Sequence, residues 1–217
     1  MPPTRQTPRR IARELALLSL SQLGDQRLAE SARPLEDLLV AAVRALTAEV
    51  RDALETAAAE AQRSRERLLA SELRAVDLQS ARVALEEALT LTQTAINHLG
   101  EAVDLPELVQ IANQAEVREY ACQLVETLDR RRSEIEQELT ASLIDWQLHR
   151  LPRIDRDILS LAVAEIRFLE VPDRVAINEA VELAKRYADA DSYRFINGVL
   201  RRVSNRPQLT PTPPPSA

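Results

Sequence analysis

A run of 65 residues, 35–99, contains neither glycine nor proline. These two residues most often end or kink a helix, so the run is expected to be helical nearly throughout. As one straight helix it would reach ~95 Å at 1.5 Å per residue, which is too long for a compact domain. The apolar periodicity weakens over 63–80, where Asp77 and Ser80 are suitable N-cap residues. The run is therefore predicted to fold back as a helical hairpin with its turn at 70–79.

The composition favours an all-α protein. Hydrophobic residues make up 45% of the 217 residues, aromatic residues only 3%, and glycine occurs three times. Such a chain packs helices through leucine, valine, isoleucine and alanine. Beyond the hairpin, helices are predicted at about 106–113, 116–132 and 133–147, and another begins at Pro152.

The sequence offers little for catalysis, metal binding or membrane insertion. It has one cysteine, Cys122, and two separate histidines, His98 and His149, so neither a disulfide nor a His/Cys metal cluster is expected. It lacks a glycine-rich phosphate loop and a nucleophile elbow. It has no stretch of about 18 apolar residues, and its start lacks the apolar core of a signal peptide. We expect a non-catalytic, soluble cytoplasmic protein with no cofactor, metal or membrane partner.

The net charge of −6 hides an uneven distribution of charge. Residues 1–29 carry five arginines and two acidic residues, and residues 194–217 carry four arginines and no acidic residue, whereas 30–149 is strongly acidic. Local potential decides whether an anion is attracted, because charges are screened beyond ~8–10 Å. If the fold brings the two basic ends together, they form one basic surface on an acidic body.

The first helix is predicted at about 9–23. Its apolar residues share one face, and three arginines, Arg9, Arg10 and Arg13, are expected on the other. Cations at a helix N-terminus oppose the macrodipole, which is unfavourable unless an anion neutralises them. RNA phosphate is one such anion. The alternative is a solvated charged end that aids solubility.

Two short amphipathic helices are predicted near the end of the chain, at 174–187 and 192–203, with a polar joint between them. Asp189, Asp191 and Ser192 can accept hydrogen bonds from the free N–H groups of the second helix, which predicts a helical hairpin capped there. Gly198 lies inside the second helix, where glycine costs about 1 kcal/mol relative to alanine. Close approach of another backbone would compensate, so Gly198 is expected at a helix crossing.

Three stretches resemble one known family. They are V-A-I-N-E-A-V-E-L-A-K at 175–185, D-S-Y-R-F-I-N-G-V-L at 191–200, and W-x-x-x-R-L-P-R-I-D-R from Trp146. Together they are similar to the NusB family of transcription antitermination factors. The resemblance does not extend over about 25–115. It implies an all-α, NusB-like helical bundle with an inserted long helical hairpin.

The resemblance also implies a division of the chain. Residues 1–24 and 101–206 would form the NusB-like domain, 25–100 the inserted hairpin, and 207–217 a disordered Pro-rich tail. Two interpretations of the hairpin stay open: it adds an interface, or it only extends the stable fold.

Members of the NusB family bind boxA RNA of ribosomal-RNA transcripts together with the ribosomal protein NusE, and the complex loads on elongating RNA polymerase to suppress termination. The resemblance therefore implies an RNA-binding transcription antitermination factor with boxA-like single-stranded RNA, NusE and the polymerase complex as partners. The alternative is a non-catalytic helical scaffold that keeps the fold without RNA recognition. The sequence leaves open whether the free protein is a monomer or a homodimer.

The resemblance implies RNA-binding residues at two places. The first is the arginine-rich start of the first helix and the second is the joint before the last helix, so the residues are Arg9, Arg10, Arg13, Asp191, Ser192, Arg194 and Phe195. Asp191 would accept a hydrogen bond from a base edge, and Phe195 would stack on a base. Their structural alternatives are a helix N-cap and a core position. The family has a glycine where Ala188 stands, which predicts a turn that either avoids left-handed backbone or carries some strain.

Overall fold

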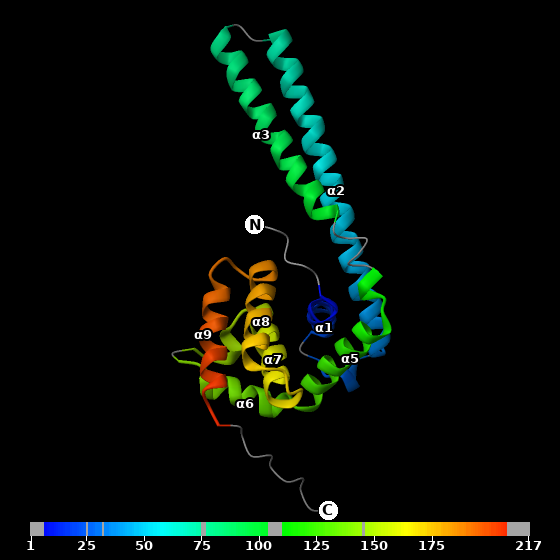
Figure 1. Cartoon of the computed structure of the whole chain (residues 1–217), viewed down its shortest axis with the longest axis vertical. Coiled ribbons are helices and arrows are strands. Elements are labelled where there is room, and N and C mark those ends of the chain that lie inside the picture. The colour runs from blue at the N-terminus through cyan, green and yellow to red at the C-terminus, as the bar shows by residue number, and fades with distance from the viewer. Residues whose placement is uncertain are drawn as a thin grey trace, which may run out of the picture. The chain divides into compact units, whose positions relative to one another are not determined.

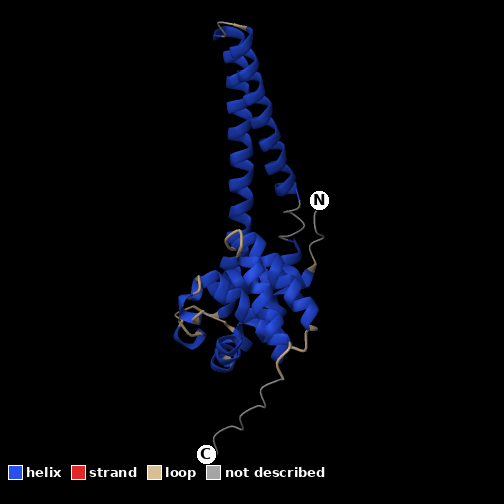
Figure 2. Ribbon diagram, turned by 90° about the vertical axis from the view of Figure 1, so that its left-hand side faces the viewer, coloured by secondary structure: helices blue, strands red, loops and turns tan. Residues whose placement is uncertain are grey.

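The computed structural model of the chain describes residues 7–24, 26–31, 33–74, 77–103, 110–144 and 146–207, and it shows helices joined by short loops (Figure 2). No strand occurs in these ranges, so the predicted all-α class is confirmed. The predicted Pro-rich tail, 207–217, lies outside the described residues apart from its first residue.

The chain divides into two compact units. Unit 1 combines Met1–Ala41 with Gln114–Ala217, and unit 2 is Ala42–Asn113. The sequence-based bounds of the insertion were 25–100, and the bounds of unit 2 are shifted toward the C-terminus relative to them.

Unit 1 is built from helices and two short 3-10 turns (Figure 1). The 3-10 turns are η1, Leu28–Glu30, and η2, Leu148–Arg150. The α-helices of unit 1 are α1, Pro8–Leu23; α5, Ala115–Arg130; α6, Arg132–Ser142; α7, Arg153–Phe168; α8, Asp173–Tyr187; and α9, Ser192–Ser204. The helix predicted from Pro152 is therefore confirmed, with Pro152 as its N-cap residue.

Helix α7 forms the centre of unit 1. It packs against α1, α5, α6, α8 and α9. Its middle is apolar nearly all round, and Ile158, Leu159 and Val163 have no exposed surface. A helix that is apolar on every side belongs in an interior, where burying each such side chain contributes ~1.5–3 kcal/mol. The other helices are therefore held in place by packing on α7.

The predicted pairing of α8 and α9 is confirmed, because the two helices pack against each other. Ala188 ends α8 in an extended conformation (φ −111°, ψ 175°), so the turn avoids left-handed backbone as predicted. Two predicted details of this helix pair were wrong. Asp191 precedes α9, but its side chain makes no capping hydrogen bond. Gly198 is not at a close crossing, since the nearest atom to an added Cβ would be Arg202 Nη1 of the same helix, at 3.8 Å.

Helix α6 is shorter than the 133–147 predicted for it, because it ends at Ser142. The last carbonyls of a helix lack partners inside the helix. Here two arginines of the C-terminal segment supply them: Arg202 Nε donates to the carbonyl of Ser142 and Arg206 Nη1 to that of Ala141, each at 2.7 Å. Of the helix predicted at 106–113, residues 110–112 are helical and 104–109 lie outside the described residues.

Unit 2 is a hairpin of two helices, α3 and most of α2, lying side by side in opposite directions (Figure 1). Helix α2 spans Leu35–Arg74 and α3 spans Leu78–Val103, so the predicted fold-back at 70–79 is confirmed. Asp77 and Ser80 form a reciprocal cap. The Ser80 N–H donates to Asp77 Oδ1 at 2.7 Å, and the Asp77 N–H donates to Ser80 Oγ at 3.2 Å.

Candidate nucleic-acid interface

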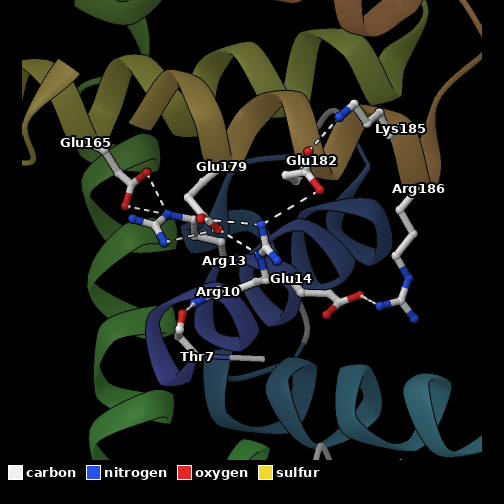
Figure 3. A network of polar contacts seen from close by, with 9 residues as sticks. All are labelled: Thr7, Arg10, Arg13, Glu14, Glu165, Glu179, Glu182, Lys185 and Arg186. Carbon is white, nitrogen blue, oxygen red and sulfur yellow. Dashed lines mark hydrogen bonds and ion pairs between the residues drawn. The ribbon is translucent and has the colours of Figure 1, made fainter. Parts of the chain in front are cut away.

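Two of the three α1 arginines face α7 and α8 instead of solvent (Figure 3). Arg10 Nε lies 3.0 Å from Glu179 Oε2 on α8. Arg13 Nε lies 2.9 Å from both carboxylate oxygens of Glu165 on α7, and Arg13 is buried. Their predicted placement on the outer face of α1 is therefore wrong. The anions that neutralise them come from the protein itself.

Glu165 is the centre of this buried network. Besides the Arg13 guanidinium it accepts the Tyr120 hydroxyl at 2.5 Å, from α5. Burial, and then the hydrogen bond to Glu165, raises the pKa of Tyr120 to about 12. Burial alone would lower the pKa of Arg13, but the hydrogen bond and charge of Glu165 outweigh it and raise that pKa. Helices α1, α5 and α7 are thus joined through one carboxylate.

A second link between α1 and α8 runs through Glu14, which is buried. Its Oε1 lies 2.7 Å from Arg186 Nη1 and also accepts the hydroxyl of Tyr187. Arg186 and Tyr187 belong to the last turn of α8, just before the joint that leads to α9. The start of α1 therefore holds both the middle and the end of α8.

Arg9 is the α1 arginine that stays exposed. Its guanidinium carbon lies 3.9 Å from the centre of the Tyr120 ring, a cation–π contact. Beside it is a hollow of about 520 Å³, and the lining includes Glu116, Glu119 and Gln123. Two carboxylates next to the arginine weaken the attraction of this hollow for phosphate.

The predicted residues at the joint have different surroundings. Asp191 and Arg194 are exposed and lie 3.4 Å apart, Asp191 Oδ1 to Arg194 Nη1. Ser192 is half-buried, and its Oγ donates at 3.1 Å to Oδ2 of the buried Asp155, which belongs to the first turn of α7. Burial raises the pKa of Asp155, the Ser192 hydrogen bond lowers it, and the charge of Asp189 raises it further, with a net rise. Ser192 thereby fixes the joint to α7.

Phe195 lies half-buried at the surface, so it is neither a free nor a fully buried core aromatic. Its ring meets the Trp146 ring edge-on, with centroids 5.9 Å apart at 63°. Trp146 is 56% exposed. It had been expected near the end of a helix, and its position beside Phe195 follows from the early end of α6.

Tyr193 adds a third aromatic ring at the joint, with two cations over it. Lys185 Nζ lies 6.0 Å and the Arg194 guanidinium carbon 5.5 Å from its centre, and Arg194 Nε donates to its hydroxyl at 3.0 Å. We call Trp146, Lys185, Asp191, Tyr193, Arg194 and Phe195 the joint cluster, which consists of two contact groups: Trp146 with Phe195, and Tyr193 with Lys185, Arg194 and Asp191. Sequence reasoning did not single out Trp146, Lys185 or Tyr193 as site residues. One available signal was that three of the chain's few aromatic residues occur in or beside the recognised motifs.

The structure brings the predicted site residues together in part. Helix α1 packs on α5 and α7, whereas α9 packs on α6, α7 and α8. The approach of α1 to α8 is confirmed by the Arg10–Glu179 ion pair. The two basic ends of the chain are thus carried by α1 and α9, which both pack on α7, and the single basic surface stays a prediction.

Other kinds of site find no support in the ranges that the structure describes. No group of three or more His, Cys, Asp or Glu side chains there could hold a metal ion. None of the described helices is long and apolar enough to cross a membrane.

A family model and curated relatives of this chain point to one family. A family model described as the NusB family matches residues 73–205. "Transcription antitermination protein NusB" of Microcystis aeruginosa is 61% identical over 202 residues, which are 93% of this chain and 93% of that protein. The protein of the same name from Synechocystis sp. is 58% identical over 205 residues, again 93% of each chain. A solved structure of T. maritima NusB is 32% identical, covers 46% of this chain and 75% of that one, and has a TM-score of 0.41.

The alignments with the two curated relatives also take in most of unit 2. They cover 93% of the chain, so the part left unaligned is much shorter than 42–113. The family model, by contrast, begins at residue 73, near the tip of the hairpin. The hairpin is therefore shared with these relatives but only partly represented in the family model.

Proposed function

The chain belongs to the NusB family, and from this we propose that it is a transcription antitermination factor that holds single-stranded, boxA-like RNA on the joint cluster. NusE would be its protein partner, and the elongating RNA polymerase complex would be the assembly to which it binds. Both proposals follow from family membership, and they would place the protein in the cytoplasm. The proposed role is binding, without a catalytic step.

The observation that carries the RNA proposal is that two aromatic groups, Trp146 with Phe195 and Tyr193 with Lys185 and Arg194, lie on different sides of the first turn of α9. Single-stranded RNA is bound by rings on which its bases stack and by cations that contact its backbone. Trp146 offers an exposed ring, and Lys185 and Arg194 lie beside Tyr193. The two groups together have the rings and the cations that a single strand passing around the start of α9 needs.

We propose separate roles for the predicted site residues. Arg194 contacts a phosphate, Phe195 supports a stacked base, and Asp191 accepts a hydrogen bond from a base edge. Ser192 positions the joint through Asp155. Arg9 adds a further phosphate contact from α1.

Arg10 and Arg13 have a different proposed role. Because they are paired with Glu179 and Glu165, RNA could reach them only by breaking ion pairs that hold α1 in place. We therefore propose that they position α1 for RNA binding without touching the RNA.

The test is RNA affinity measured by fluorescence anisotropy at several salt concentrations, with boxA-like and scrambled oligonucleotides, with and without NusE. Arg194→Ala should weaken binding and flatten the slope of log affinity against log salt by ~0.7 for one lost phosphate contact. Arg130→Ala on α5 is the matched control, because the two arginine side chains are 72% and 69% exposed and each has an ion pair with an acidic residue three or four positions earlier.

Two outcomes would contradict the proposal. Equal effects of Arg194→Ala and Arg130→Ala would mean that the joint cluster is not the RNA surface. No RNA binding at all, even with NusE present, would favour the alternative of a helical scaffold without RNA recognition.

A further inference from the structure

Over 54–99 the hairpin of unit 2 buries small residues and leaves most of its large apolar residues exposed. On α3 the residues facing α2 include Ala88 and Ala95, which are buried. The large apolar residues Leu78, Leu85, Leu89, Ile96 and Leu99 are exposed. Together with Arg82 and Thr92, they follow the alternating four- and three-residue spacing of a helix that packs on another helix.

Helix α2 repeats this arrangement. Ala57 and Ser64 are buried toward α3, and the Ser64 hydroxyl donates to the carbonyl of Ala88 at 2.7 Å. A second stripe, exposed, follows the same spacing on α2: Leu54, Ala58, Ala61, Arg65 and Leu68. Small residues between the two helices let them approach closely, so the larger side chains are not needed inside the hairpin.

The two exposed stripes lie on the same side of the hairpin. On each helix a stripe residue follows an inward-facing residue by one position, as Leu89 follows Ala88 on α3 and Ala58 follows Ala57 on α2. One residue is a rotation of about 100° in the same sense on both helices. Because the helices run in opposite directions, these rotations turn both stripes toward one side. They form a single two-helix face, which we call the stripe face.

We propose that the stripe face is a dimerisation surface, on which the hairpin of a second copy of this chain packs to complete a four-helix bundle. The α3 stripe spans 78–99, ~32 Å at 1.5 Å per residue. Two helices ~8–10 Å apart present a face ~20 Å wide. The contact would bury ~600 Å² on each copy, ~1,200 Å² in total, which reaches the lower end of stable interfaces.

Charge selects the second copy over a nucleic acid. Residues 42–113 contain seven arginines and twelve acidic residues, so unit 2 repels phosphate. One arginine interrupts each stripe, Arg65 on α2 and Arg82 on α3, and Glu86, which borders the α3 stripe, lies 3.3 Å from Arg82 of its own helix, so both signs occur along this face. A face with both signs can pair with itself when a two-fold axis opposes the arginine of one copy to the glutamate of the other. One arginine in each stripe would also fix the register.

The test is the oligomeric state of the full chain by sedimentation equilibrium, from ~1 to ~100 µM. Leu85→Asp places a charge in the stripe face and should raise the dimer dissociation constant more than ~100-fold, because an unpaired buried carboxylate is costly. Val83→Asp is the matched control. Val83 is 46% exposed and Leu85 45%, but Val83 lies off the stripe.

Circular dichroism and a second variant distinguish a weaker dimer from loss of folding. Leu85 is half-exposed in the single chain, so Leu85→Asp should keep the helical content of the wild type, and Leu89→Ser should weaken the dimer in the same way. A wild-type chain that stays monomeric at ~100 µM would overturn the proposal, since the stripe face would then serve a different protein. Equal weakening by Val83→Asp and Leu85→Asp would overturn it as well.

Discussion

Arg13 and Glu165 form a buried ion pair that joins the first helix of the chain to its central helix. Arg13 Nε lies 2.9 Å from both oxygens of the Glu165 carboxylate, and the two side chains are 6% and 2% exposed. Tyr120 donates to the same carboxylate. Removing one partner of such a pair leaves the other charge buried without compensation, which costs far more than losing a surface ion pair.

Arg13→Ala should therefore lower the free energy of unfolding by ~3–5 kcal/mol. Arg9→Ala is the matched control from the same helix, because Arg9 is exposed and makes no buried ion pair within the described part of the chain, and its cation–π contact with Tyr120 is worth ~0.5–1 kcal/mol. Urea unfolding followed by circular dichroism measures both. If the two variants lost similar amounts of unfolding free energy, the Arg13–Glu165 pair would contribute no more to stability than an exposed contact. A charge reversal at Arg13 can thus not serve as a test of RNA contact alone.

The single tryptophan should report RNA binding at the joint cluster. Trp146 is exposed and touches Phe195, and the chain has no other tryptophan. A base that stacks there should change Trp146 fluorescence in proportion to the RNA bound. Phe195→Ala should remove ~1–3 kcal/mol of binding free energy, the usual effect of losing one stacking ring. If RNA binds by anisotropy and the fluorescence stays constant, the bases lie elsewhere.

Much of the fold could be predicted because it depends on local signals. The position of the fold-back in unit 2 was predicted from the weakening apolar periodicity and from two possible N-cap residues, Asp77 and Ser80. These two residues do form a reciprocal cap. The bounds of α8 and α9 followed from apolar spacing and a polar joint. Such signals lie within a few residues of the structure they determine.

The burial of Arg13 and the end of α6 could not be predicted in this way. Arginine is treated as polar in an analysis of apolar periodicity, so Arg13 was assigned to the solvent-facing side of its helix. Its partner Glu165 is 152 positions away in sequence, so no local pattern indicates the ion pair. Helix α6 ends at Ser142, whose carbonyl accepts a hydrogen bond from Arg202 of α9. Both outcomes depend on contacts between distant segments, and these carry no local sequence signal.

Asp191→Asn should change RNA recognition without changing stability. The Asp191 side chain is 89% exposed and makes no capping hydrogen bond, so the free energy of unfolding should change by less than about 0.5 kcal/mol. Loss of one negative charge beside a phosphate path should raise overall RNA affinity. Preference for boxA-like over scrambled RNA should fall, because an amide can donate as well as accept. The test is to measure the affinities of wild type and variant for both RNAs at one salt concentration. If the ratio of the boxA-like to the scrambled affinity is unchanged, Asp191 takes no part in base recognition.

Asp155 should make stability depend on pH in the acidic range. It is buried, only its Oδ2 has a hydrogen-bond partner, and its pKa in the folded protein is raised above the ordinary 3.8. The folded state therefore holds this proton more tightly than the unfolded state does. Between pH 3.8 and the raised pKa the folded chain binds more protons at this site, so the contribution of Asp155 to the free energy of unfolding falls as pH rises through that window and is constant above it.

Asp155→Asn isolates this contribution, since asparagine can still accept from Ser192 but cannot ionise. The free energy of unfolding of the variant minus that of the wild type should increase as pH rises from 3.8 and then level off once Asp155 is ionised in the folded wild type. Urea unfolding of both proteins at half-unit steps from pH 4 to 7 measures the difference. Ser71→Ala in α2 is a control that removes an exposed hydroxyl with no titration, and its difference should be flat. A flat difference for Asp155→Asn as well would mean that the carboxylate is solvated in the folded protein, and Ser192 would then not be fixing the joint through a buried acid.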